Sequence, residues 1–511
     1  MALSINTNIG ALGAAAAASA VNKSMETSME RLSTGLRINS SADDAAGMAI
    51  TSRMEAAVRG MNQAIRNAMD TQALIDTAEG AQSETMNLLQ RMRELAIQAA
   101  TDTNSQSDRT ALNSEIIQLR AEIDRIADTT TWAGQKVLDG SFVGKTFQIG
   151  AFEGETINVS QKSVKTADFG QHYKDTVAFF SAEGASAASA ALNTIAADTL
   201  TVVGKSGSST VSTSADGSAK DLAALVNAKT SSTGVYAKAQ TAVKLSGLSA
   251  NPVGSTTSFT LQAGSGTAVS ISATVTDNAD LSTLVSVINT NSGTTGITAE
   301  FDGTDKSAII LRDADGDNIQ ITDFSSTGAS SSALTIAVSY ATTYDATAFS
   351  SAGTLTSAAS TDSIDVGGVA RFYSTESFTV SGDSGDADGT DDATGFFASA
   401  GVASSLSKVS TVSVATRAGA AAAIDVLDSA IQFISDARSS LGAISNRLDS
   451  TVSNLTNIVG NTESSRARIE DADFAAESTN LAKAQILQQA ATAMLAQANA
   501  SKQGVLQLLQ G

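Results

Sequence analysis

The stretch of sequence that decides the fold is IDVLDSAIQFISDARSSLGAISNRLDSTVSNLTNIV, residues 424–459. Its large apolar side chains recur at steps of three and four residues, and the two polar sites on this heptad grid are Arg438 and Ser445. The apolar sites are Ile424, Leu427, Ile431, Ile434, Leu441, Leu448, Val452, Leu455 and Val459. A helix with such a narrow apolar stripe needs a partner helix to cover it. The segment therefore predicts a long helix in a coiled-coil pair.

Similar stripes elsewhere at the two ends of the chain supply the partners. In the N-terminal part they comprise Val21, Met25, Met29, Leu32 and Leu36, then Ile50, Met54, Val58, Met61, Ile65 and Ala68 with a continuation to Leu89, then Leu112, Ile116, Leu119, Ile123 and Ile126. Near the C-terminus the series is Leu487, Ala491, Met494, Ala498, Ser501, Val505 and Leu508. We expect N-terminal and C-terminal helices to pair antiparallel into a rod, with the two termini together at one pole.

Between the helical ends lies a region of different composition. From about residue 180 to residue 404 the chain is dominated by Ser, Thr, Gly, Ala, Asp and Val, and it holds the single proline, Pro252. Apolar and polar side chains alternate there, as in VSISATV at residues 269–275, and alternation is typical of half-buried strands. The predicted fold is therefore α+β and multidomain: a long antiparallel helical coiled-coil rod formed by the terminal segments, with an inserted β-rich region of two subdomains.

The composition of the 511-residue chain excludes several classes of function. The absence of cysteine excludes a disulfide framework, a thiol nucleophile and a cysteine-based zinc site. The single histidine, His172, excludes zinc motifs that need two histidines. The net charge of −20 argues against nucleic acid as a partner, because phosphate binding relies on clustered Lys and Arg. We expect a protein that is not an enzyme and that has no metal and no cofactor.

Neither end of the sequence predicts a cleaved signal peptide or a membrane anchor. Residues 1–20 (MALSINTNIGALGAAAAASA) have no basic segment before their apolar run. Residues 484–501 are uncharged over nearly the length of a membrane span, but their amide side chains make insertion costly. These amides are Gln485, Gln488, Gln489, Gln497 and Asn499. We expect a helix buried among protein helices and no membrane contact.

The outermost helical segments are weaker than the inner ones. Residues 14–18 are all alanine, and residues 484–501 are rich in alanine and glutamine. At about 25 cal/mol per Å² of apolar surface, such faces barely offset backbone ordering at about 1–2 kcal/mol per residue. We predict that both segments are disordered in the monomer and fold when neighbouring subunits cover them. This behaviour indicates assembly rather than catalysis.

Six motifs, in order along the chain, resemble bacterial flagellins, the subunits of the flagellar filament. They are RLSTGLRINSSADDAAGMAI (31–50), LLQRMRELAIQAA (88–100), GQKVLDGSF (134–142), NRLDSTVSNLTN (446–457), ARIEDADFA (467–475) and AKAQILQQAATAMLAQAN (482–499). The resemblance implies a secreted structural subunit that self-assembles into the extracellular filament and leaves the cell by type III export. The implied partners are further copies of the chain, the flagellar cap and hook-associated proteins, an export chaperone and the host flagellin-sensing Toll-like receptor.

The resemblance also implies a division of the chain into an inner tube, a rod and an outer region. The expected parts are 1–43 (N-terminal inner-tube helix and linker), 44–179 (rod helices and β-hairpin), 180–404 (variable outer region), 405–463 (C-terminal rod helix) and 464–511 (C-terminal inner-tube helix). Inner-tube assembly is expected to involve Met25, Leu32, Leu481, Leu487, Met494, Leu495, Val505 and Leu508. The linker is expected to act as a hinge at Gly35, Asn39, Asp43 and Asp44, and its acidic residues are N-cap candidates for the next helix.

A charged motif within residues 88–100 is the candidate contact surface. Arg91 and Leu95 lie four residues apart on one face of a predicted helix, and from its residues alone the motif is a solvated charged stripe. In flagellins the corresponding motif contacts neighbouring protofilaments and the host receptor, together with a glutamate that Glu115 matches. The residues carried over are Gln90, Arg91, Arg93, Glu94, Leu95 and Glu115.

The central region contains a weak internal repeat, with copies near residues 200–250 and 259–322. Each copy predicts strands, a short helix and further strands, and it resembles a repeat inserted in some flagellins. In the first copy the matching residues are Asp221, Leu222, Asn227, Gly234, Val235 and Ala237, and in the second they are Asp280, Leu281, Asn289, Gly296, Ile297 and Ala299. Glycine-rich residues 134–159 predict turn-rich hairpins.

Other functions have specific counterarguments or remain open. A hook-filament junction protein shares the helical ends, and the β-rich region offers an adhesive or glycan-binding role. Two acidic runs, DADGD (313–317) and GDSGDADGTDD (382–392), suggest a calcium site, but neither fits an EF-hand loop. In the first run, Phe324 stands at the twelfth position, where that loop needs glutamate. Aspartate and glycine are also the usual turn formers, so turns are the favoured interpretation.

Overall fold

The computed structural model describes residues 7–177, 180–183, 199–214, 217–248, 255–303, 305–327, 335–357, 362–383, 396–397 and 401–510. Pro252 and most of the second acidic run lie outside the described residues. The chain forms two compact units. The first comprises Met1–Thr77, Val143–Ser160 and Ser440–Gly511, and the second comprises Ala78–Phe142 and Gln161–Ser439. Each unit therefore combines segments that are far apart in the sequence.

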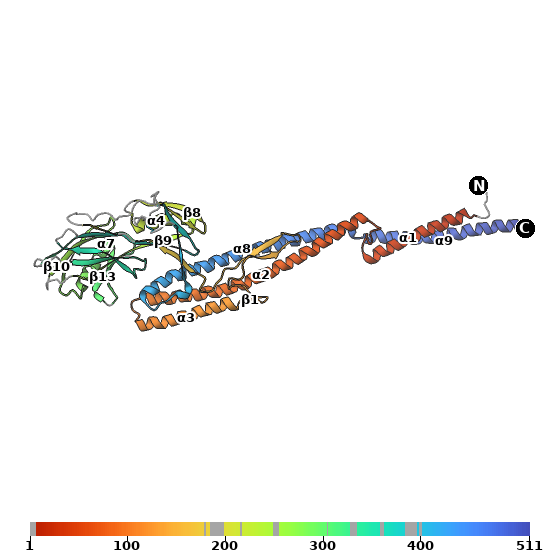
Figure 1. Cartoon of the computed structure of the whole chain (residues 1–511). Helices are drawn as coiled ribbons and strands as arrows, with labels where there is room; N and C mark the ends of the chain where they lie inside the picture. Colours follow the sequence, from red (N-terminus) through yellow and green to blue (C-terminus); the bar gives the residue numbers. More distant parts are fainter. Residues whose placement is uncertain are drawn as a thin grey trace. The chain divides into compact units, whose positions relative to one another are not determined.

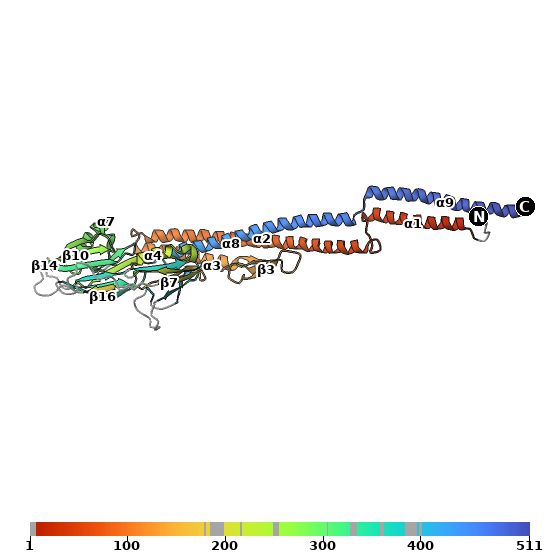
Figure 2. The same cartoon turned by 90° about the horizontal axis from the view of Figure 1, so that it is seen from above.

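Two helices from opposite ends of the chain pair in the first unit. They are α1 (Ile9–Thr34) and α9 (Phe474–Gln510), which lie side by side in Figures 1 and 2. Asn8 Nδ2 donates a hydrogen bond to the carbonyl oxygen of Ala498 at 3.2 Å. Further along α1, Gln488 Nε2 donates to Asn22 Oδ1 at 2.9 Å. Positions rise along α1 as they fall along α9, so the predicted antiparallel pairing of the terminal segments is confirmed.

The two longest helices, α2 (Ala45–Ala100) and α8 (Arg417–Glu470), contribute to both units. In the first unit, Gln72 Nε2 donates to Asp449 Oδ1 at 2.9 Å. In the second, Arg438 Nη2 donates to Glu79 Oε1 at 3.1 Å. This order of contacts again requires an antiparallel pair.

The heptad grid of α8 is the face that packs on α2. Every second site of the grid is buried, namely Leu427, Ile434, Leu441, Leu448 and Leu455, and the intervening sites are half-buried. On α2 the predicted stripe is buried at Val58, Met61 and Ala68 and half-buried at Met54 and Ile65, but Ile50 is exposed. A groove of about 570 Å³, lined partly by the short side chains of Ala57 and Ala151, leaves Ile50 uncovered. The predicted stripe is therefore correct except at its first residue.

By length and hydropathy, α8 is also the one helix among the described residues that could cross a bilayer. The mean hydropathy of its most apolar window is 1.3. A core helix passes the same test, and the stripe of α8 is packed on α2. The hydropathy is therefore weak evidence for a membrane span.

Helix α3 (Gln106–Thr129) completes the helical part of the second unit. It begins with a capping box in which the Ser105 side chain accepts from the Asp108 N–H and the Asp108 side chain accepts from the Ser105 N–H. Ile116, Ile123 and Ile126 are buried, as their spacing predicts. The glycine-rich segment forms two small hairpins: β1 (Thr131–Trp132) with β2 (Gln135–Lys136), and β3 (Lys145–Gln148) with β4 (Thr156–Val159).

The central region forms three larger antiparallel sheets in the part of the chain that is described. The eight-stranded sheet contains β5 (Gly170–Asp175), β9 (Tyr236–Ser246), β12 (Ile297–Asp302), β13 (Asp305–Asp313), β15 (Thr335–Ala341), β16 (Phe349–Thr356), β18 (Val369–Ser374) and β21 (Ser405–Lys408). The five-stranded sheet contains β6 (Phe180–Glu183), β10 (Ser255–Ala263), β11 (Val269–Val275), β14 (Ile319–Thr327) and β17 (Ser363–Val366). The four-stranded sheet contains β7 (Thr199–Gly204), β8 (Gly207–Ser212), β19 (Thr379–Asp383) and β20 (Val402–Ala403).

The alternation seen in the sequence corresponds to burial in these sheets. On β11, Ile271, Ala273 and Val275 are buried, whereas the serines and threonine between them are exposed. Among the described residues, one large apolar cluster forms around Leu261 and Ile309, another around Leu200 and Phe372, and a smaller one around Ala242 and Ile310. The prediction of a β-rich insertion is confirmed.

The internal repeat is visible as two matching arrangements of helix and strand. In the first copy, α4 (Ala219–Asn227) and α5 (Thr230–Thr233) precede β9; in the second, α6 (Ser282–Thr290) and α7 (Ser292–Thr295) precede β12. Asn227 Nδ2 donates to the Ala237 carbonyl at 2.8 Å and Asn227 Oδ1 accepts from the Ala237 N–H at 2.9 Å. Asn289 makes the same pair of bonds to Ala299, at 2.9 and 2.7 Å.

The register of the repeat corrects one part of the sequence match. Aligning Asn227 with Asn289 places the buried Leu222 opposite the buried Leu284. Leu281, the predicted counterpart, instead occupies the N-cap position of α6, about one turn earlier and without a capping hydrogen bond. The reason is that the second copy has three more residues between its aspartate and its asparagine, and helical packing follows the asparagine.

Candidate functional site

Large apolar side chains are uncovered on the pair of terminal helices. Ile9 and Leu12 of α1 are exposed, as are Ile486 and Met494 of α9, at 67% and 64%. The α9 residues that face α1 are mostly small or polar, namely Glu477, Leu481, Ala484, Gln488, Ala491, Leu495 and Ala498. The pair therefore keeps most of its larger apolar groups on the outside, where other molecules can cover them.

The predicted inner-tube residues divide into two sets. Met25, Leu32, Leu481 and Leu495 are half-buried in the helix pair, whereas Leu487 and Met494 are exposed. The side chains of Val505 and Leu508 lie outside the described part of the chain. The predicted stripe therefore had the wrong phase at Leu487 and Met494, and likewise at Met29, where Ser28 is buried instead. Polar contacts set the phase, because Gln488 bonds Asn22 and Glu477 lies 3.9 Å from Arg31.

The linker between α1 and α2 is tied by hydrogen bonds within the first unit. Gly35 ends α1 with φ of 74°, a left-handed conformation that suits glycine. Asp43 Oδ2 accepts from the N–H of Asn39 at 3.2 Å and of Ser40 at 2.9 Å. The bonds from Ser40 lower the pKa of the Asp43 carboxyl. Asp44 Oδ1 accepts from the N–H groups at the start of α2, so it acts as the predicted N-cap.

A second connection lies directly beside this linker. Leu36 forms an antiparallel bridge with Asp471, and the Ala472 N–H donates to the Gly35 carbonyl at 2.9 Å. The Arg37 N–H donates to the Glu470 carbonyl at 2.6 Å. The linker between α1 and α2 is therefore hydrogen-bonded to the segment that connects α8 and α9.

The charged motif forms an exposed patch on α2 and α3 in the second unit. Arg91 Nη2 donates to Glu115 Oε1 at 2.9 Å, and Arg91 Nη1 donates to Glu94 Oε2 at 3.0 Å. Hydrogen bonds to Glu115, and then to Glu94, raise the pKa of the Arg91 guanidinium. Gln90 is exposed beside them. The structure thus brings Glu115 next to the motif, as the resemblance implies.

Two residues of the motif lie apart from this patch. Leu95 is 1% exposed and belongs to the core of the second unit. Positions four apart on a helix differ by about 40° around the axis, which is enough here to turn Leu95 inward while Arg91 stays in solvent. Arg93 points to α8, where it forms an ion pair with Asp428. The exposed patch therefore consists of Gln90, Arg91, Glu94 and Glu115.

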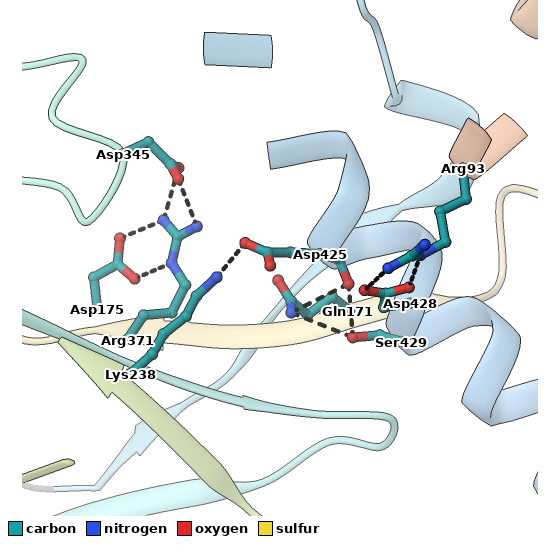
Figure 3. Close-up of polar contacts among 9 residues, drawn as sticks. All are labelled: Arg93, Gln171, Asp175, Lys238, Asp345, Arg371, Asp425, Asp428 and Ser429. Atoms are coloured by element: carbon teal, nitrogen blue, oxygen red, sulfur yellow. Dashed lines mark hydrogen bonds and ion pairs between the residues drawn. The ribbon is translucent and has the colours of Figure 1, made fainter. Parts of the chain in front are cut away.

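A polar cluster that was not predicted from the sequence joins the eight-stranded sheet to α8 (Figure 3). We call it the sheet–helix junction. Arg371 of β18 donates through Nε and Nη2 to Asp175 at 2.6 and 2.7 Å, and through Nη1 and Nη2 to Asp345 at 3.0 and 2.9 Å. Its guanidinium carbon lies 4.6 Å from the ring centre of Tyr173 and 4.9 Å from that of Tyr344. Two carboxylates and two aromatic rings therefore surround this cation.

Further contacts continue the junction to the helix. Lys238 of β9 forms an ion pair with Asp425 of α8. Gln171 of β5 is buried, and its Nε2 donates to Ser429 Oγ at 3.2 Å. These side chains come from three neighbouring strands, β9, β18 and β5. The sheet is thereby held against α8 by charge and hydrogen bonds.

Burial and pairing act in opposite directions on Arg371, whose side chain is 7% exposed. Burial lowers the pKa of the guanidinium, but the hydrogen bonds and charges of Asp175 and Asp345 raise it by more, so the net shift is upward. Burial also raises the pKa of the Tyr344 phenol to about 12. One signal in the sequence was available: Arg371 stands in VARFYS, residues 369–374, and a cation in such an apolar strand needs carboxylate partners.

The described residues contain no cluster of His, Asp and Glu side chains that could hold a metal ion. In the first acidic run, Asp313 Oδ1 accepts from the N–H of Asp315 at 2.8 Å and of Gly316 at 3.0 Å. Lys220 Nζ donates a hydrogen bond to Oδ2 of the neighbouring Asp317 at 2.7 Å. This run is therefore a turn whose carboxylates bind backbone and lysine. His172 lies on β5, where burial lowers its pKa.

Helices that keep such side chains uncovered at both ends of a chain define a structural protein built for self-assembly. Two family models agree with this class: the bacterial flagellin N-terminal helical region matches residues 5–143, and the C-terminal helical region matches residues 424–509. The chain belongs to the bacterial flagellin family. A third model, the flagellin hook IN motif, matches residues 199–251, which cover the first copy of the repeat.

Relatives match over the whole length of the chain. A B-type flagellin of Pseudomonas aeruginosa is 38% identical over 100% of both chains, and flagellin B of Vibrio cholerae is 32% identical over 100% of both. A solved structure of FliC from Burkholderia pseudomallei is 28% identical, covering 29% of this chain and 56% of that one, with a TM-score of 0.21. The full-length relatives carry the assignment. The chain is a non-enzymatic structural subunit of the extracellular flagellar filament, and the alternative of a junction protein is set aside.

Proposed function

We propose that the α1–α9 pair is the surface through which this filament subunit polymerises, and that both helices order fully when neighbouring subunits cover them. The observation that carries the proposal is the exposure of Ile9, Leu12, Ile486 and Met494. Full burial of a large aliphatic side chain contributes about 1.5–3 kcal/mol. The α9 residues that face α1 are mostly small or polar, so most of this stabilisation must come from outside the monomer.

Truncation of α9 tests the proposal. Deleting residues 484–511 should abolish polymerisation on addition of ammonium sulfate or filament seeds, as seen by negative-stain electron microscopy. Circular dichroism of the monomer should lose little helical signal, because the deleted segment is poorly ordered before assembly. Filaments that form normally from the truncated chain would contradict the proposal. A large loss of monomer helicity would contradict only the claim about order.

A second proposal concerns the exposed patch of Gln90, Arg91, Glu94 and Glu115. We propose that it contacts neighbouring protofilaments and, on the free subunit, the host flagellin-sensing receptor. Its support is the solvent exposure of these side chains and the fixed geometry of the Arg91–Glu115 pair. Leu95 and Arg93 act by positioning the patch, because one is buried and the other is paired with Asp428.

Charge reversal at this patch separates a contact role from a structural one. Glu115→Lys should weaken receptor activation in a reporter-cell assay and disturb filament formation, with unchanged monomer stability. Glu122→Lys is the matched control, because Glu122 lies on the same helix in an exposed pair with Arg125. Equal effects of the two variants would contradict a specific contact at Glu115.

Further partners follow from the family expectation alone. We propose that the filament cap, the hook-associated proteins and an export chaperone bind the helical ends, and that the linker at Gly35, Asn39, Asp43 and Asp44 adjusts the angle between tube and rod. The division at residues 43, 179, 404 and 463 belongs to the same proposal. Co-purification of the chaperone with the full chain, lost on truncation of α9, would test the first of these contacts.

A further inference from the structure

A cavity of about 510 Å³ lies beside the sheet–helix junction in the second unit. Small-molecule sites generally span about 300–1,000 Å³. One wall is made by Tyr236 of β9 and Tyr373 of β18, which stand directly opposite each other in the sheet. The other wall is one face of α8 with Asp425, Asp428, Gln432 and Asp436. Nothing in filament assembly accounts for a hollow of this composition.

The two tyrosines form an aromatic platform. Their ring centres are 5.7 Å apart with an interplanar angle of 24°, so the rings are stacked. Tyr236 is 50% exposed although it is held in this pair. A half-exposed, fixed aromatic ring at the edge of a cavity offers an apolar surface without a cost in side-chain ordering.

The charges around the cavity are already balanced. Each of the three aspartates on the α8 wall has a cationic partner in the chain. The pairs are Asp425 with Lys238, Asp428 with Arg93, and Asp436 with Lys205. An ionised carboxylate has about four acceptor positions, so these groups can still accept hydrogen bonds from a ligand. A cationic ligand would find no uncompensated charge on these three aspartates, whereas a neutral hydroxyl donor would find acceptors.

Neutral polar groups fix the remaining lining. Gln171 and Ser429 are buried at the cavity and bonded to each other at 3.2 Å. Gln432 Nε2 donates to Asp436 Oδ1 at 2.8 Å, which orients both side chains along α8. Ser206 and Thr375 add hydroxyl groups at the rim. Polar groups from both α8 and the strands are thus held in place around the exposed Tyr236 ring.

We propose that this cavity binds a saccharide. The C–H face of a neutral pyranose ring stacks on the exposed Tyr236 ring, which Tyr373 supports from its other side, and the sugar hydroxyl groups donate to the carboxylates and the amide oxygen of α8. This ligand class combines an apolar face with many hydroxyl donors and no charge, as the lining requires. The site gives the β-rich region a binding function in addition to its place in the filament.

Saturation-transfer NMR on the full-length monomeric chain tests the proposal. The probes are cellobiose, lactose and N,N′-diacetylchitobiose, whose mostly equatorial substituents leave C–H groups on at least one face of each ring. At least one probe should receive saturation at its ring C–H protons. Tyr236→Ala should weaken that binding about fivefold to tenfold, and Tyr236→Phe should retain most of it because the ring remains. Leu225→Ala, at an exposed apolar site on α4 that does not line the cavity, should leave it unchanged.

Other outcomes overturn the proposal. They are the absence of transfer to all three sugars at millimolar concentration, transfer that is equal in the parent and in Tyr236→Ala, and transfer to spermidine or choline without transfer to any sugar. Thermal unfolding and filament formation should be the same in Tyr236→Ala and the parent. That result would separate lost binding from lost structure and from failure of the assembly proposal.

Discussion

At the residue scale, Arg371 shows how a buried charge fixes its own strand, β18, against β5 and against the turn that carries Asp345. Two carboxylates form ion pairs with its guanidinium, and the centres of two tyrosine rings lie 4.6 and 4.9 Å from its central carbon. Desolvation of such a cation costs several kcal/mol, and the paired carboxylates offset that cost only in one geometry. The cluster therefore favours one packing arrangement of β18, β5 and the Asp345 turn more than it adds to the net free energy of unfolding.

Removing this cation should be strongly destabilising. Arg371→Met leaves Asp175 and Asp345 without their partner, and the expected loss is about 3–5 kcal/mol in the unfolding of the β-rich region. Urea unfolding followed by near-ultraviolet circular dichroism measures it. Arg125→Met is the control, because its pair with Glu122 is exposed and should contribute under about 1 kcal/mol. Similar losses of stability in the two variants would show that the buried cluster contributes no more than an exposed ion pair.

The Tyr344 phenol gives the same cluster a pH dependence. Its pKa is raised from 10.0 to about 12, first by burial and then by Asp425, so the folded state holds this proton more tightly than the unfolded state. The resulting stabilisation is fully present below pH 10 and is lost as pH rises toward 12. Absorbance titration of the parent minus Tyr344→Phe should show one tyrosine with a midpoint near 12. A difference midpoint at 10 would contradict the burial of this phenol.

At the element scale, the two copies of the repeat use one device to join helix to strand. An asparagine side chain forms both an accepted and a donated bond with one alanine of the following strand. It closes the helix–turn–strand unit as a backbone pair would. Glycines at φ of 72° and 76°, Gly234 and Gly296, end the short second helix in each copy.

Equal geometry predicts equal energetics in the two copies. Asn227→Ala and Asn289→Ala should each cost about 1–3 kcal/mol, because each leaves a donor and an acceptor of the strand without a partner. Hydrogen exchange at Ala237 and Ala299 reads the local effect. Thr290→Ala, which removes an exposed hydroxyl bonded within α6, should change little. A large effect in only one copy would contradict structural equivalence.

Helix pairing was predictable from sequence where one stripe dominates and not where two compete. In α8, large aliphatic residues occupy most of one heptad grid and the other positions are mostly small or polar, so one face minimises exposed apolar area. In α9, alanine and glutamine make several faces nearly equal. Contacts of Gln488 with Asn22 and of Glu477 with Arg31 then select the phase, and they expose Leu487 and Met494.

At the scale of the whole molecule, the composition of each region and its heptads predict the class of fold, but the one local signal of the sheet–helix junction, a cation in an apolar strand, does not identify its partners. Arg371, Asp175 and Asp345 lie in separate parts of the sequence. Strand register pairs Arg371 with Asp175, and the turn between β15 and β16 brings Asp345 to the same guanidinium. The cavity beside the junction depends on the same register, through Tyr236 and Tyr373. Such sites emerge from topology and cannot be inferred from spacing.

Different residues of the chain determine the stability of the monomer and the stability of the filament. Two substitutions that shorten a side chain by a similar amount should show this. Met494 is 64% exposed, so Met494→Ala should leave monomer unfolding unchanged but raise the critical concentration for polymerisation about tenfold, the equivalent of about 1.4 kcal/mol of lost burial. Leu448 is buried on the α8 grid, so Leu448→Ala should instead destabilise the monomer by about 2–5 kcal/mol. Sedimentation of polymer across a concentration series and thermal unfolding of the monomer provide the two readouts. An unchanged critical concentration in Met494→Ala would mean that this side chain stays exposed in the filament, and the α1–α9 surface would then need a different contact face.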